Sequence, residues 1–142
     1  MKKDVLISIK GIQSADGESD AVELTTRGSF YRKKDDYYIC YDESLLTGME
    51  GMKTILKVEG NHKVTMTRSG TSRQQLIIEK GARHQCRYDV GFDFLTIGVS
   101  CDGITSKLTD SGGELNFKYS LDINTALSSE NEVFINIEEC KI

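Results

Sequence analysis

Apolar and polar residues alternate with a period of two along most of the chain, which is the pattern of half-buried β-strands. No stretch of useful length has the 3.6-residue spacing of an amphipathic helix. The 13 glycines fall between short runs rich in Val, Ile, Thr, Tyr and Phe, and the chain contains no proline. The pattern therefore predicts an antiparallel meander whose ladders are not interrupted by a missing backbone donor. We expect strands over residues 4–12, 21–34, 37–43, 51–59, 63–69, 73–79, 83–90, 94–101, 104–110, 114–124 and 131–138.

The apolar phase predicts a hairpin around residues 60–62. Val58 lies opposite Val64 if the loop contains these three residues. Glu59 then faces Lys63 on the outer surface, and such an opposite-charge pair supports the register.

The same reasoning predicts a second three-residue loop at 80–82. Ile78 then lies opposite His84, and Glu79 faces Arg83.

A third hairpin is predicted at Asp102-Gly103, because Asp-Gly is a strong signal for a two-residue turn with positive φ at the glycine. This register places Cys101 opposite Ile104, Val99 opposite Ser106, and Ile97 opposite Leu108.

So many short strands with one apolar face need a sandwich or a closed barrel, and consecutive hairpins favour up-and-down closure. A chain of 142 residues has the length of one domain. The predicted fold class is therefore all-β, an antiparallel up-and-down meander closed into a barrel over residues 1–142. The segment 44–49 breaks the pattern and is interpreted as a single helical turn at the barrel's end. The predicted inward residues are Leu56, Val64, Met66, Leu76, Ile97, Val99, Phe117 and Leu121.

Charge and composition limit the classes of partner that we expect for the chain. The net charge is −4 and the sequence pI is about 5.2, which weighs against nucleic acid. The apolar stretch 5–9 is too short for the core of a signal peptide, and no segment approaches a membrane span. We therefore expect a cytoplasmic protein that does not bind membranes. The four cysteines lack metal-ligand spacing and there are two histidines, so we expect no metal, no cofactor and reduced thiols.

Polar residues with the inward phase gather at one end of the predicted barrel. This end carries the loops 44–50, 69–73, 90–93 and 111–113, whereas the loops 60–62, 80–82 and 102–103 lie at the other end. Arg68 is expected opposite Thr54, and Gln74 opposite Tyr88. With an apolar floor of Leu56, Met66, Leu76 and Ile97, the arrangement is typical of a small-ligand pocket. The candidate ligand-binding residues are Glu50, Thr54, Arg68, Gln74, Tyr88 and Tyr41.

Other interpretations of these residues stay open. A pair between Glu50 and Arg68 can simply close the barrel end. His84 is interpreted as a hydrogen-bonded core histidine and Cys86 as a packing residue, because strand neighbours two apart lie too far from each other for a nucleophile pair. No catalytic residue is therefore assigned.

Three classes of function remain. The first is a barrel that binds a small polar or anionic ligand. The second is an interaction or regulatory module with a filled barrel, and a homodimer is left open. The third is a hydrolase-like enzyme that uses Glu50 as acid or base with Tyr88 nearby.

The chain also carries a combination of segments known from one family. These are residues 37–39, 47–58, 68–70, 95–99, 112–115 and 119–123. Together they resemble the YwiB-like family of uncharacterised bacterial proteins, and the resemblance spans nearly the whole chain. It implies a calycin-like, lipocalin-type β-barrel and implies no activity. The chain departs from the family at residues 89–92, where a Thr-Pro-Tyr-Gly-type turn is common, and it lacks the lipocalin Gly-x-Trp motif because it has no tryptophan.

Overall fold

The computed structural model describes residues 2–43, 51–70, 73–89 and 94–140, and the regular structure in them is antiparallel β-sheet. The predicted all-β class is therefore confirmed. The predicted helical turn at 44–49 lies outside the described residues. The ten strands of the described residues are β1 (Lys3–Ala15), β2 (Glu18–Lys33), β3 (Asp36–Asp42), β4 (Lys53–Glu59), β5 (Lys63–Ser69), β6 (Arg73–Glu79), β7 (Arg83–Asp89), β8 (Phe94–Thr109), β9 (Gly112–Ile123) and β10 (Ala126–Glu139).

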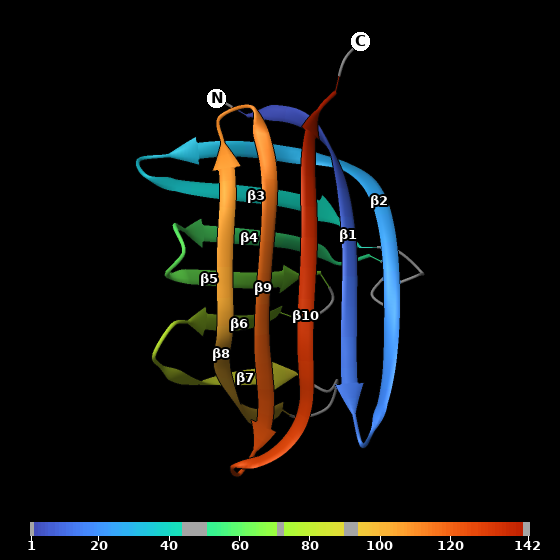
Figure 1. The fold of residues 1–142 in the computed structure, drawn as a ribbon, viewed down its shortest axis with the longest axis vertical. Helices are drawn as coiled ribbons and strands as arrows, with labels where there is room; N and C mark the ends of the chain where they lie inside the picture. The colour runs from blue at the N-terminus through green and yellow to red at the C-terminus, as the bar shows by residue number, and fades with distance from the viewer. Residues whose placement is uncertain (1, 44–50, 71–72, 90–93, 141–142) are drawn as a thin grey trace.

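The strands form one sheet in the order β6-β5-β4-β3-β2-β1-β10-β9-β8-β7. Figure 1 shows two layers: the long strands β8, β9, β10, β1 and β2 run across the short strands β3 to β7. β2 belongs to both layers, because it pairs with β1 from Glu18 to Phe30 and with β3 from Gly28 to Lys33. The result is a nearly closed up-and-down barrel with its two sheet edges at β6 and β7.

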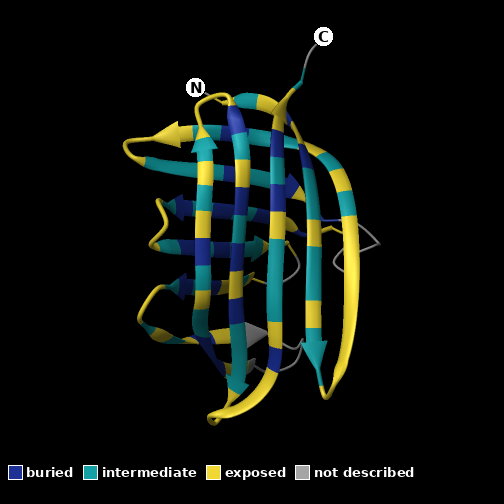
Figure 2. Cartoon of the chain, in the orientation of Figure 1, coloured by how far each residue is buried: buried dark blue, intermediate teal, exposed yellow. Residues whose placement is uncertain are grey.

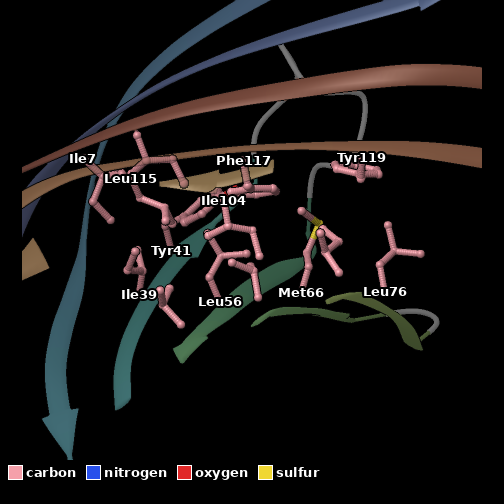
Figure 3. Packing of buried hydrophobic residues seen from close by; sticks show 14 of the residues in the cluster. Ile7, Ile39, Tyr41, Leu56, Met66, Leu76, Ile104, Leu115, Phe117 and Tyr119 are labelled. Carbon is pink, nitrogen blue, oxygen red and sulfur yellow. The ribbon is translucent and has the colours of Figure 1, made fainter. Parts of the chain in front are cut away.

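The core lies between the two layers, where the inward faces of the strands meet (Figure 2). Seven of the eight predicted inward residues are buried, and the eighth, Leu121, is partly buried and packs against them. Figure 3 shows Phe117 and Tyr119 of β9 facing Leu56, Met66 and Leu76 of the other layer. The period-two pattern thus assigns the inward faces correctly.

The loop at 60–62 is confirmed in detail. Val58 pairs with Val64, and Glu59 pairs with Lys63, as the apolar phase predicts. Gly60 has a φ of 57°, in the left-handed region that glycine tolerates.

The register predicted around the loop 80–82 is wrong. β6 and β7 are not neighbours in the sheet, so Ile78 does not pair with His84, nor Glu79 with Arg83. Arg83 instead reaches across β8 to β9, where its Nε donates to Oδ2 of Asp122 at 3.0 Å. The guanidinium of Arg83 is therefore paired with a carboxylate on β9, and β6 and β7 form the two open edges of the sheet.

Both histidines contact the carboxylate of Glu79 near these loops. His62 Nε2 lies 3.0 Å from Oε2, and His84 Nε2 lies 2.7 Å from Oε1. The hydrogen bond with His84 lowers the pKa of Glu79. His84 is half-buried and hydrogen-bonded, and Cys86 is buried, as interpreted from the sequence.

The predicted hairpin at Asp102-Gly103 is also wrong. β8 runs without interruption from Phe94 to Thr109, and its register against β9 shifts between Cys101 and Gly103. The extra residue makes a β-bulge. The predicted pairs of Cys101 with Ile104, Val99 with Ser106, and Ile97 with Leu108 are therefore wrong as well. Gly103 is not among the residues with positive φ.

Because β8 continues past residues 102–103, β9 and β10 run in the direction opposite to the predicted one. The turn after β8 therefore lies at the end opposite to the predicted one. Asp110 in this turn accepts a hydrogen bond from the Tyr37 hydroxyl at 3.1 Å, at the start of β3. The predicted grouping of loop 111–113 with the polar barrel end is thus wrong.

Candidate functional site

Beside the packed core, the space between the two layers includes a pocket that is open to solvent on one side. The volume of this cavity is about 280 Å³. Three of the four predicted floor residues line it, whereas Ile97 is buried elsewhere in the core. Its apolar lining includes Leu56, Met66, Leu76, Phe117, Leu121 and Ile135.

A row of polar residues crosses four adjacent strands at one side of this cavity. Tyr41 of β3 pairs with Thr54 of β4, Thr54 with Arg68 of β5, and Arg68 with Gln74 of β6. The predicted opposition of Arg68 and Thr54 is confirmed. Tyr41 and Thr54 are buried, while Arg68 and Gln74 are partly exposed. The structure therefore brings together four of the six candidate residues.

The counter-charge of Arg68 in the described residues is Glu43. Its Oε2 lies 3.4 Å from Arg68 Nε and accepts a hydrogen bond from the Thr54 hydroxyl at 2.6 Å. The Glu43 side chain is only 1% exposed, and the Glu43 backbone N–H donates to the carbonyl of Met52 at 2.8 Å. Sequence reasoning missed Glu43, although it shares the inward phase of Ile39 and Tyr41.

Arg68 lies at the boundary between protein and solvent, with 18% of its side chain exposed. Its Nε is buried and makes no hydrogen bond in the part of the chain that the structure describes. The ion pair with Glu43 compensates the charge without the alignment of a hydrogen bond. A guanidinium has five N–H donors, so Arg68 has donors on its terminal nitrogens besides Nε.

Tyr41 stays a neutral phenol over the whole physiological range. Burial and the nearby Glu43 carboxylate raise the pKa of Tyr41 to about 12, against the opposing effects of Arg68 and Thr54. A neutral hydroxyl can both donate and accept at the cavity wall.

The two other candidates are Glu50 and Tyr88. Glu50 lies outside the described residues. Only the backbone of Tyr88 is described; it pairs with Leu95 on β8, and β7 is not a neighbour of β6. The predicted opposition of Gln74 and Tyr88 is therefore wrong.

A second hollow lies on the outer face of the long strands. Its volume is about 540 Å³, and Phe134, which is 40% exposed, lies in it. In the described ranges, no helix is long and apolar enough to cross a membrane. The same residues contain no cluster of three or more His, Cys, Asp or Glu side chains arranged to hold a metal ion.

Comparison with known proteins assigns the chain to a family. The model of a domain of unknown function, DUF1934, matches residues 7–135. The chain belongs to the DUF1934 family. A curated relative, the uncharacterised β-barrel protein YwiB of Bacillus subtilis strain 168, is 27% identical over 119 residues, which is 84% of this chain and 82% of that protein.

The solved structures support the same fold. The crystal structure of the YwiB protein from Bacillus subtilis matches with a TM-score of 0.83 at 24% identity and covers 99% of this chain and 94% of that one. The YwiB-like resemblance and the β-barrel are thus confirmed for this DUF1934 member. The calycin likeness and the cytoplasmic location stay predictions, and the family description gives no activity.

Proposed function

We propose that this barrel binds a small molecule with an apolar body and a polar or anionic head group. The observation that carries the proposal is the pocket between the two layers, because a barrel that serves only as an interaction module has no need of such a pocket. Apolar walls with a few convergent polar groups are typical of ligand sites.

The polar row gives the head group its partners. Arg68 and Tyr41 line the cavity together with Glu43. The Arg68–Glu43 pair is neutral as a unit, so the head group is held by directed hydrogen bonds from the guanidinium more than by net charge. Carboxylate, phosphate and amide oxygens are acceptors of the right kind.

The volume limits the size of the ligand. Ligand pockets usually measure roughly 300–1,000 Å³, and the cavity of about 280 Å³ lies just below that range. A metabolite with one ring or a short chain fits this space, whereas a dinucleotide or a long lipid does not.

The test is a thermal-shift screen of carboxylates, phosphates and neutral amides against the intact protein. We expect at least one compound to raise the melting temperature of the wild type in a concentration-dependent way, and Arg68→Ala to abolish the shift. Because Arg68→Ala leaves Glu43 unpaired, the double variant Glu43→Gln/Arg68→Met provides a folded barrel without the ion pair. Arg73→Ala, an exposed arginine on β6, is the control. A wild type that responds to no compound in the screen would contradict the proposal.

The outer hollow favours an interaction surface as the second candidate. Phe134 lies exposed among polar side chains of the long strands, and exposed aromatic residues are enriched at interfaces. A homodimer through this face predicts that Phe134→Asn shifts the sedimentation of the protein toward the monomer. A wild type that sediments as a monomer at all concentrations would remove this dimer.

A further inference from the structure

A second polar row faces the same cavity from the other layer. Gln13 of β1 pairs with Asp20 of β2 on one side and with Asn131 of β10 on the other, and Asn131 pairs with Tyr119 of β9. All four residues line the cavity that Arg68 lines. The cavity thus lies between two polar rows, one on each layer.

The two rows differ in charge. In the first row, Glu43 balances Arg68. In the second row, Asp20 forms no ion pair with another described residue, so its carboxylate remains available at the rim. Asn131 donates from Nδ2 to the Ser129 hydroxyl at 3.0 Å, which leaves its carbonyl oxygen as an acceptor. The second row therefore offers acceptors, where the first row offers a guanidinium.

The two rows approach each other across the cavity. Packed β-layers lie roughly 10 Å apart, and side chains extend into this space from both sides. Tyr119 of the second row is near enough to Tyr41 of the first to influence its ionisation.

We infer that the ligand is a small zwitterion, with an ammonium and a carboxylate side by side on an apolar body, as in an amino acid with an apolar side chain. The carboxylate accepts from the guanidinium of Arg68, and the ammonium donates to Asp20 and to the Asn131 carbonyl. The apolar side chain packs on Leu56 and Met66. This inference rests on the proposed function and specifies its ligand class.

Charge balance favours the zwitterion over simpler ligands. A plain anion at Arg68 meets repulsion from both Glu43 and Asp20. A plain cation satisfies Asp20 and leaves the guanidinium donors without an acceptor. Only a ligand with both charges uses both rows, and unpaired polar groups discriminate strongly against analogues that lack a partner.

Three compounds with the same aromatic body test this inference by calorimetric titration of the intact protein. L-Phenylalanine carries both charges, 3-phenylpropionate lacks the ammonium, and 2-phenylethylamine lacks the carboxylate. We expect L-phenylalanine to bind at least about tenfold more tightly than either analogue, which corresponds to the loss of one charge-assisted hydrogen bond.

The variant Asp20→Asn isolates the second row. Asp20 is exposed, so the substitution leaves the fold intact. We expect it to weaken the binding of L-phenylalanine at least about fivefold, and to leave the binding of 3-phenylpropionate unchanged or tighter. Glu23→Gln, on the same strand but with its side chain directed to the outer surface toward Lys10, is the matched control and should change nothing.

The outcomes separate this inference from the proposed function. If 3-phenylpropionate binds as tightly as L-phenylalanine and depends on Arg68, the ligand site stands and the zwitterion is wrong. If none of the three compounds binds, the zwitterion is likewise wrong, and the wider thermal-shift screen decides on the site itself. Equal binding of L-phenylalanine to the wild type and to Asp20→Asn would also overturn the role of the second row.

Discussion

Glu43 holds the polar side of the cavity together through two partners. It accepts from Thr54, which is fully buried, and pairs with Arg68, which is partly exposed. Removing one partner of a buried ion pair costs more than the pair contributes, because the remaining charge is left without compensation. The arrangement is therefore sensitive to single substitutions and more tolerant of paired ones.

Glu43→Gln should destabilise the fold by about 3 kcal/mol, because Arg68 loses its counter-charge and Thr54 loses a charged acceptor. The double variant Glu43→Gln/Arg68→Met should cost less than the sum of the two single variants. Urea unfolding of all four proteins measures the cycle. A Glu43→Gln protein with the same free energy of unfolding as the wild type would show that the pair has no structural role.

Tyr41 makes stability depend on pH in the alkaline range. The pKa is about 12 in the folded state and about 10 in the unfolded chain. Below pH 10 the phenol is neutral in both states and contributes no pH dependence. Between pH 10 and 12 only the unfolded state ionises, so the free energy of unfolding falls by about 2–3 kcal/mol in total. In Tyr41→Phe, the free energy of unfolding should not show this part of the decline with pH. Denaturant titrations of the two proteins between pH 10 and 12 measure the difference. Parallel plots of the free energy of unfolding against pH would contradict the raised pKa of Tyr41.

At the scale of the strands, the apolar phase predicts registers where one face is clearly apolar. β5 and β6 have the predicted bounds, and the hairpin between Val58 and Val64 is right, because a one-residue slip would turn every side chain to the wrong face. The phase fails at Asp102-Gly103, since an Asp-Gly pair fits a bulge as well as a turn and the alternation continues on both sides.

The Asp-Gly pair that does form a turn lies earlier in the chain. Asp16 and Gly17 both have positive φ, 51° and 79°, in the two-residue loop between β1 and β2. The alternation predicts no strand over residues 13–20, because this stretch has few apolar positions to fix a phase. Gln13 and Asp20 lie on these strand extensions, so the second polar row is not predicted from the sequence.

Gly17→Ala should destabilise the protein by about 1 kcal/mol, because an alanine at a φ of 79° is strained although its Cβ meets no neighbour. Gly103→Ala is the matched control: its Cβ also meets nothing, and its φ lies outside the left-handed region, so it should cost less than about 0.5 kcal/mol. Thermal melts of the two variants give the comparison. A larger loss of stability for Gly103→Ala than for Gly17→Ala would indicate that the hairpin lies at residues 102–103.

At the scale of the molecule, the first and last strands lie in the middle of the sheet. β1 and β10 pair over ten residues, from Val5–Glu139 to Ser14–Glu130. The barrel therefore opens between β6 and β7, which are consecutive in the chain, and not between its terminal strands. Short hairpins in the sequence predict the meander and the first polar row, but they carry no information on which pair of strands is left unpaired, because that depends on the twist and bending of the whole sheet.

This topology predicts that the chain can be opened at residues 80–82 and rejoined at its ends. The backbone N–H of Cys140 donates to the carbonyl of Asp4 at 3.1 Å, so a short glycine-serine linker can connect the termini. The loop 80–82 joins two sheet edges that share no ladder, so cutting it removes no strand pairing. A permutant that begins at Ala82 and ends at Lys80 should keep its β-sheet circular dichroism and unfold cooperatively, with a loss of about 1–2 kcal/mol from the longer loop and the new ends.

The control permutant is opened between Phe134 and Ile135, in the middle of β10. This cut divides the strand that joins β1 to β9, so the two halves of the sheet lose their covalent register and we expect no cooperative unfolding transition. If the permutant opened at 80–82 also fails to fold, pairing between β6 and β7 holds the barrel closed, and the sheet order is wrong at its two edges. If it folds and still binds the ligand of the wild type, the cavity between the two layers does not depend on that seam.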